Sequence, residues 1–152
     1  MSSVLRAVIV EMLTGLDFFD AAAVDRARDD ASAHGSRTKL VGMQPQKFLF
    51  LALHGHDLTK EKRLADAVAT GARFSSIPML KVELRDDEKL QVIGHEGRHR
   101  MRLLRDRGIS NAPVEIRAVN LRWGASQIPE TIVSENGVIE YQTSQVFLSV
   151  EV

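Results

Sequence analysis

The sequence predicts an α+β fold, in which helices pack against a sheet of mixed or antiparallel strands. Helix patterns and strand patterns alternate along the chain, and two pairs of strand patterns are separated by short polar turns typical of hairpins. With 152 residues, 44% of them hydrophobic and 26% charged, the chain is long enough to bury a substantial core as one domain.

Residues 1–37 are expected to form a strand–helix extension of this domain. Residues 4–13 have the alternating pattern of a strand. Leu16–Ala33 is predicted to be a helix with Asp17 as its N-cap. The side chains expected to face the core are Phe18, Ala22 and Val24.

Residues 38–119 are expected to form the core of the domain, and residues 38–43 its first strand. Pro45 suits the first turn of a helix, and Gly55 lies just past the expected end of that helix. Most side chains between them are apolar, so this helix should be largely buried. Residues 59–69 predict a third helix. Its inward side chains are expected to be Leu64, Ala65 and Val68.

The second half of the chain predicts hairpins. Residues 78–84 and 89–94 are expected to be two strands joined by the polar turn 85–88. An arginine-rich helix follows, ending at Arg107, and residues 113–119 predict another strand. Residues 120–152 are expected to add a hairpin with an Asn-Gly turn at 136–137 and a final strand over 145–152.

The most informative segment is Gly94-His95-Glu96-Gly97-Arg98-His99-Arg100, named here the arginine box. Two glycines let an anion approach the backbone closely, and the first N–H groups of a helix have no partner within the helix. A helix N-terminus with nearby cations is suited to a phosphate or another oxyanion. The predicted phosphate-binding residues are Gly94, Gly97, Arg98, His99, Arg100 and Arg102.

The position of these cations favours a bound anion. Arg98 and Arg100 lie where positive charge opposes the helix dipole, each at a cost of roughly 0.3–1 kcal/mol that an anion would offset. Arg98, Arg102 and Arg105, at i, i+4 and i+7, are expected to form one basic face of the helix. The alternative is a solvated arginine-rich helix with a glycine turn, in which Glu96 and Asp106 form local ion pairs.

The order of motifs from residue 77 to residue 119 resembles the N-terminal domain of the ParB/sulfiredoxin superfamily. The matching segments are Ile77-Pro78, Asp86-Asp87, Val92-Ile93-Gly94, Gly97-Arg98-His99-Arg100, Gly108 and Ala112-Pro113-Val114-Glu115-Ile116. The resemblance implies a ParB/sulfiredoxin-like mixed sheet, with His99 and Arg100 as phosphate contacts. Its ParB members bind a nucleoside triphosphate, so a triphosphate with Mg²⁺ is the implied cofactor. Arg98 stands where sulfiredoxin has its catalytic cysteine, which excludes that reductase activity.

Two functions follow from these observations. The first is binding of a nucleotide or nucleic-acid phosphate at the arginine box. Hydrolysis, as in a nuclease or NTPase, would depend on the nearby proton-transfer groups Glu96, His95 and His99. The alternative is a protein-interaction module without enzymatic activity, encoded by a phage or mobile element, in which the box is vestigial. No match to the last ParB nucleotide motif follows residue 119, and no helix-turn-helix pattern does.

Composition narrows the function classes. Lys and Arg number 20, as do Asp and Glu, so the whole chain has no positive field to coat nucleic acid nonspecifically. There is no cysteine, which excludes thiol catalysis and thiolate metal sites. His54, His56 and Asp57 could ligate a metal, but histidines at a helix end are ordinary, so no metal site is predicted. With no secretory signal and no membrane-length apolar segment, a cytoplasmic protein is expected.

Overall fold

The computed structural model describes residues 16–32, 37–52, 58–119 and 129–140. It confirms the α+β class. The elements, in chain order, are the 3₁₀ helix η1 (Leu16–Phe18), α2 (Ala21–Ser32), β1 (Thr38–Met43), α3 (Pro45–Leu51), α4 (Leu58–Ala69), β2 (Met79–Leu84), β3 (Leu90–Glu96), α5 (Arg98–Asp106), β4 (Ala112–Ala118), β5 (Thr131–Ser134) and β6 (Gly137–Glu140).

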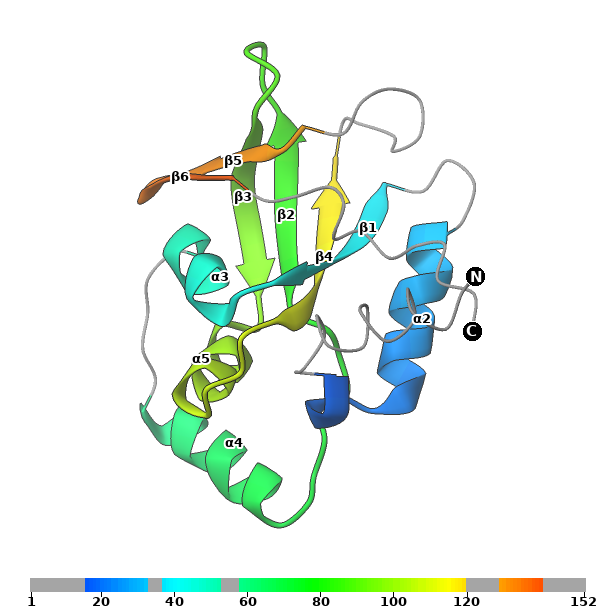
Figure 1. The fold of residues 1–152 in the computed structure, drawn as a ribbon, viewed down its shortest axis with the longest axis vertical. Coiled ribbons are helices and arrows are strands. Elements are labelled where there is room, and N and C mark those ends of the chain that lie inside the picture. The colour runs from blue at the N-terminus through cyan, green and yellow to red at the C-terminus, as the bar shows by residue number, and fades with distance from the viewer. Residues whose placement is uncertain (1–15, 33–36, 53–57, 120–128, 141–152) are drawn as a thin grey trace.

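The strands form one mixed sheet with the order β1-β4-β2-β3-β5-β6. The pairs β1–β4, β2–β3 and β5–β6 are antiparallel, whereas β2–β4 and β3–β5 are parallel. Both hairpins expected from the sequence are therefore present, and the sheet is mixed as predicted. Figure 1 shows β2, β3 and β4 crossing the middle of the molecule, with the β5–β6 hairpin angled across them.

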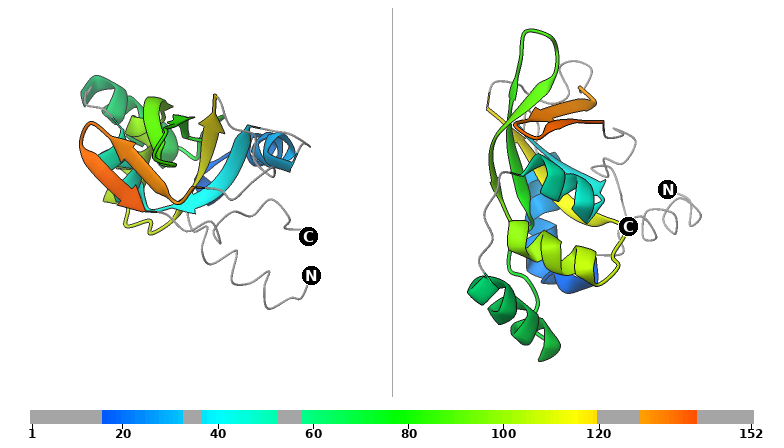
Figure 2. Two further views of the ribbon diagram at one scale, coloured as in Figure 1. Left: turned by 90° about the horizontal axis from the view of Figure 1, so that it is seen from above. Right: turned by 90° about the vertical axis from the view of Figure 1, so that its left-hand side faces the viewer.

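The core lies between this sheet and the helices α2, α3 and α5. Figure 2 shows α3 and α5 together on one side of the curled sheet, and α2 lies beside β1. The fully buried side chains come from both layers, so sheet and helices share one apolar interior. The largest of these side chains are Phe19, Phe48, Leu40, Leu51, Leu80, Leu90, Met101, Leu104, Ile116 and Ile132.

The first predicted helix is shorter than expected, and Asp17 is not its N-cap. Phe19 leaves the helical path to form an isolated bridge with Phe74, and the centroids of their rings lie 5.2 Å apart. Helix α2 then begins after Asp20, whose carbonyl oxygen accepts hydrogen bonds from the first turn. The predicted helix is interrupted at Phe19, because the β-bridge with Phe74 gives this residue an extended backbone.

The buried face of α2 is also shifted from the prediction. Ala22 is exposed and Phe18 is only partly buried. Val24 is buried as expected, and so are Ala23 and Ala27.

The other described elements lie within a few residues of their predicted positions. Helix α3 ends at Leu51, before the expected end near Gly55, which lies outside the described residues together with His54, His56 and Asp57. The predicted strands over residues 4–13 and 145–152 also lie outside them. Within the described part of the chain, no helix has the length and apolarity needed to cross a membrane.

Candidate functional site

The arginine box lies where β3 meets α5, and a single residue connects the two elements. Strand β3 extends to Glu96 and α5 begins at Arg98, so Gly97 alone makes the turn. Its φ of +104° is in the left-handed region that disfavours side chains. A Cβ atom there would lie 2.8 Å from the backbone Cα of Pro78, so this position requires glycine.

Gly94 has a different role from the one predicted. Gly94 lies inside β3 and pairs with Lys81 of β2, so Gly97 alone, and not both glycines, makes the turn before α5. The register of the hairpin shifts here, with Val82 opposite Val92, so Ile93 is the extra residue of a bulge. Gly94 does not have a positive φ, and a Cβ on it would make only an ordinary contact of 3.5 Å with Lys81.

A cleft of about 370 Å³ opens at the N-terminus of α5, and we name it the box cleft. The N-cap of α5 is Gly97, which has no side chain to cap the helix, and the first backbone N–H groups of α5 lie at this end. The box cleft combines these donors with basic side chains from two helices. Its lining residues are Lys60, His95, Glu96, Gly97, Arg98, His99 and Arg100.

The arginines of α5 point to different partners. Arg98, the first residue of the helix, lines the box cleft. Arg100 also lines it, but its Nη1 atom donates hydrogen bonds to the backbone oxygen and the Oγ atom of Ser76. Burial lowers the pKa of Arg100, and the carboxylate of Glu96 acts in the opposite direction. Arg100 therefore ties α5 to the segment before β2 in addition to facing the cleft.

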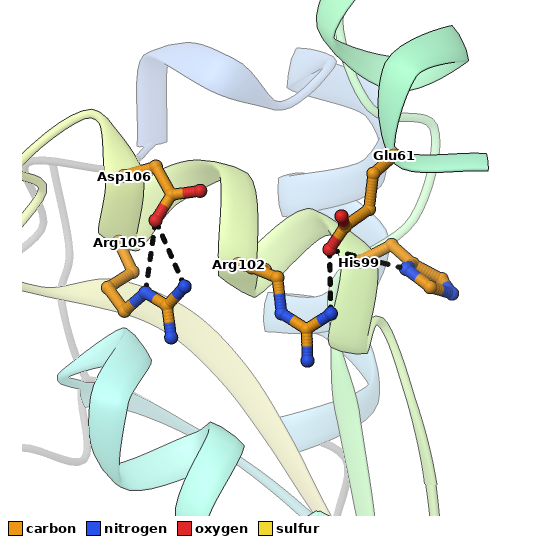
Figure 3. A network of polar contacts seen from close by, with 5 residues as sticks. All are labelled: Glu61, His99, Arg102, Arg105 and Asp106. Atoms are coloured by element: carbon orange, nitrogen blue, oxygen red, sulfur yellow. Dashed lines mark hydrogen bonds and ion pairs between the residues drawn. The ribbon is translucent and has the colours of Figure 1, made fainter. Parts of the chain in front are cut away.

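Arg102 does not face the box cleft, and the expected basic face of α5 is not continuous. Arg102 donates a hydrogen bond of 2.7 Å to Glu61 of α4. Arg105 pairs with Asp106 at 3.0 Å, as the solvated-helix alternative expected for Asp106. Figure 3 shows these two ion pairs side by side along α5. These carboxylates offset the repulsion between two arginines that lie near each other on the helix.

His99 lies between α5 and α4 and is almost completely buried, with a relative exposure of 8%. Its Nδ1 atom lies 3.9 Å from a carboxylate oxygen of Glu61, too far for a hydrogen bond, and has no hydrogen-bond partner among the described residues. Glu61 thus lies beside both Arg102 and His99 (Figure 3).

The pKa values of both histidines of the box are lowered, which favours the neutral imidazole. Burial lowers the pKa of His99 from its ordinary value of 6.5, and the charges of Arg98 and Lys60 lower it further. The carboxylate of Glu61 raises the pKa of His99, but the lowering by burial is the larger effect. Burial and Arg98 likewise lower the pKa of His95. A neutral imidazole accepts a proton, so the cleft places two proton acceptors next to its cations.

A second cleft of about 450 Å³ runs between α4 and α5, and we name it the interhelix cleft. His99 lines both clefts, so the two clefts are adjacent. The interhelix cleft has an apolar part and a charged rim. Its lining residues are Leu58, Glu61, Lys62, Ala65, His99, Arg102, Leu103, Asp106 and Arg107.

The structure brings together four of the six predicted phosphate-binding residues, whereas Gly94 lies inside β3 and Arg102 pairs with Glu61. The three predicted proton-transfer groups, Glu96, His95 and His99, line the same cleft.

Sequence reasoning missed Lys60 and Glu61 of α4. The charged run Lys60-Glu61-Lys62-Arg63 was the available signal, since an acidic residue in it could pair with an arginine-rich helix. Among the described residues, no group of three or more His, Asp or Glu side chains is arranged to hold a metal ion.

Comparisons with known proteins leave the resemblance to the ParB/sulfiredoxin superfamily as a prediction from sequence. No protein-family model, no curated protein and no solved structure matches this chain.

Proposed function

We propose that this protein binds the phosphate of a nucleotide or nucleic acid in the box cleft. The observation that carries the proposal is that the N-terminal N–H groups of α5 and the side chains of Lys60, Arg98 and Arg100 lie at one concave site. Cations at a helix N-terminus are unfavourable without a counter-charge, and a phosphate would accept hydrogen bonds from both sets of donors.

The distribution of charge supports this proposal. Helices α4 and α5 together contain seven basic and three acidic residues, a net charge of +4 in a chain whose total is zero. The β5–β6 hairpin, residues 130–140, contains three acidic residues and no basic residue. Figure 1 places α4 at one end of the long axis and the β2–β3 turn, with Asp86, Asp87 and Glu88, at the other. An anion would therefore be attracted to the box end.

Hydrolysis is a reaction that the same site could support. A neutral histidine, His95 or His99, could accept a proton from an attacking water, and Glu96 could hold Mg²⁺ bound to a triphosphate. The ParB/sulfiredoxin resemblance points to His99 and Arg100 as phosphate contacts. Lys60 is a further candidate phosphate contact, because it lines the same cleft. Arg98 is the first residue of α5 and so lies nearest to the N-terminus of the helix.

Thermal unfolding with ATP, GTP, CTP and UTP, each with and without Mg²⁺, tests the proposal. A ligand at about 100 times its Kd stabilises the protein by roughly 2.7 kcal/mol, a shift of several degrees in Tm. We expect the shift to disappear in Arg98→Ala and Lys60→Ala. Arg105→Ala is the matched control, because Arg105 is on the same helix and pairs with Asp106 outside the box cleft.

Phosphate release, measured on the same samples, tests hydrolysis separately from binding. A nucleotide that shifts Tm in Arg98→Ala as strongly as in the parent protein would overturn the site assignment. The absence of any shift with nucleotides, inorganic phosphate or an oligonucleotide would overturn the proposed function and favour the protein-interaction alternative.

The interaction alternative predicts an exposed apolar or acidic patch away from the box. The large exposed apolar side chains of the described residues are Phe50, Leu58, Ile93 and Val138. They belong to four different elements, α3, α4, β3 and β6, and Leu58 lines the interhelix cleft. Scattered apolar residues of this kind are normal on protein surfaces, so they do not by themselves favour a protein partner.

A further inference from the structure

The interhelix cleft extends the box cleft along the length of α5. The two clefts share His99, and the interhelix cleft continues to Arg107, the C-cap of α5. Nine residues of α-helix span about 13 Å, at 1.5 Å per residue. A mononucleotide phosphate occupies only one end of such a surface.

The charges of the interhelix cleft divide into paired and unpaired groups. Glu61 is paired with Arg102, and Asp106 with Arg105. Lys62 and Arg107 are exposed and make no ion pair with any residue in the described part of the chain. After pairing, the cleft therefore retains positive charge, at Lys62 and Arg107.

The interhelix cleft also has an apolar part beside these cations. Leu58 is 72% exposed at its edge, and Ala65 and Leu103 lie farther inside. A large apolar side chain beside unpaired cations suits a ligand that is both anionic and partly apolar. A simple anion would leave these apolar side chains in water.

We propose that the box cleft and the interhelix cleft together bind a single-stranded nucleic acid, with one phosphate in the box cleft and the following nucleotides along α5. This proposal rests on the proposed phosphate site. About 13 Å accommodates about four phosphates at the spacing of a stacked strand, and fewer if the strand is extended. Lys62 and Arg107 contact the later phosphates, and an unpaired base packs on Leu58.

Single strands fit these clefts better than duplexes. In a duplex the bases are stacked inside the helix and cannot reach Leu58 or Leu103, whereas a single strand exposes base faces next to its phosphates. The guanidinium plane of Arg102, held by Glu61, provides a second flat surface for a base.

Fluorescence anisotropy with a labelled oligothymidylate of about six nucleotides, within the usual footprint of such sites, tests the proposal. We expect it to bind at least about tenfold tighter than thymidine monophosphate, a difference of about 1.4 kcal/mol. The double variant Lys62→Ala/Arg107→Ala should lose most of this gain while keeping its affinity for the mononucleotide. Each cation removed should reduce the salt slope by about 0.7.

The controls separate this proposal from the phosphate site itself. Arg85→Ala, in the β2–β3 turn outside both clefts, should leave strand binding unchanged, and Arg98→Ala should weaken both the strand and the mononucleotide. Equal affinity for strand and mononucleotide, tighter binding of a duplex, or full strand affinity in Lys62→Ala/Arg107→Ala would overturn the single-strand proposal and leave the phosphate site standing. Failure of every ligand to bind the parent protein would overturn both proposals.

Discussion

Helices α3 and α4 follow each other between β1 and β2, yet they are attached to the molecule in opposite ways. Helix α3 buries Pro45, Phe48 and Leu51 and contacts α5, β5 and β6. Helix α4 contains no buried residue and packs mainly on α5. Figure 2 shows α3 tucked against the sheet and α4 projecting from the end of the molecule.

This difference shows how the two clefts are built. The sheet and α5 provide a fixed base, whereas α4 provides the second wall with Lys60, Glu61 and Lys62. A wall held by half-buried side chains and by the ion pair of Glu61 with Arg102 costs less free energy to move than a buried helix. We therefore expect substitutions in α3 to affect global stability and substitutions in α4 to affect ligand binding more than folding.

The largest expected effect is on α3. Phe48→Ala should lower the free energy of unfolding by about 3–5 kcal/mol, because it leaves a cavity in the core. Leu64→Ala in α4 is the matched comparison and should cost about 1 kcal/mol, since Leu64 is only partly buried. Urea unfolding followed by circular dichroism measures both. Equal losses would show that α4 is as firmly integrated as α3.

The next effect concerns the turn that fixes the base of the box cleft. Gly97→Ala should cost about 1–3 kcal/mol for the left-handed backbone alone, and more because of the contact with Pro78. Gly108→Ala has a similar backbone with nothing within 4 Å, so it isolates the cost of the backbone. Gly94→Ala should be nearly neutral. A loss in Gly94→Ala as large as in Gly97→Ala would contradict the one-residue turn.

The sheet and the helices packed on it, including α3, could largely be predicted from sequence. Period-two strands, the Pro45 helix start and the Asn136-Gly137 turn are local signals, and each element lies near its predicted position. The break at Phe19 could not be predicted, since it depends on Phe74, which is 55 positions away in sequence and pairs with it only in the folded chain.

The candidate site was less predictable, for the same reason. Sequence placed the glycines and cations at the start of a helix, but not where each arginine points. Arg100 and Arg102 find partners at Ser76 and Glu61, 24 and 41 positions away. Helix periodicity identifies the face on which a side chain lies, while the choice between a ligand and a distant carboxylate depends on tertiary packing.

A smaller effect tests the attachment of α4. Glu61→Gln should lower the free energy of unfolding by about 0.5–1 kcal/mol, because the ion pair with Arg102 is only partly shielded from water. A double-mutant cycle with Arg102→Gln measures the coupling of the pair. Coupling near zero would mean that α4 is held by its apolar contacts with α5, and the ion pair would then serve only to neutralise Arg102.

The smallest expected effect is a dependence of stability on pH in the mildly acidic range. The pKa of His99 is lowered in the folded protein, so the unfolded chain takes up a proton first as pH falls below the ordinary value of 6.5. The free energy of unfolding should then be constant above that pH and decrease below it, until pH falls through the folded-state pKa. His95 adds to this slope in the same direction.

Urea unfolding of the parent protein and of His99→Gln between pH 7.5 and 5.5 measures the contribution of His99. An unchanged slope in His99→Gln would assign the effect to His95, and rising stability at lower pH would mean that protonated His99 pairs with Glu61 strongly enough to overcome burial and the charges of Arg98 and Lys60.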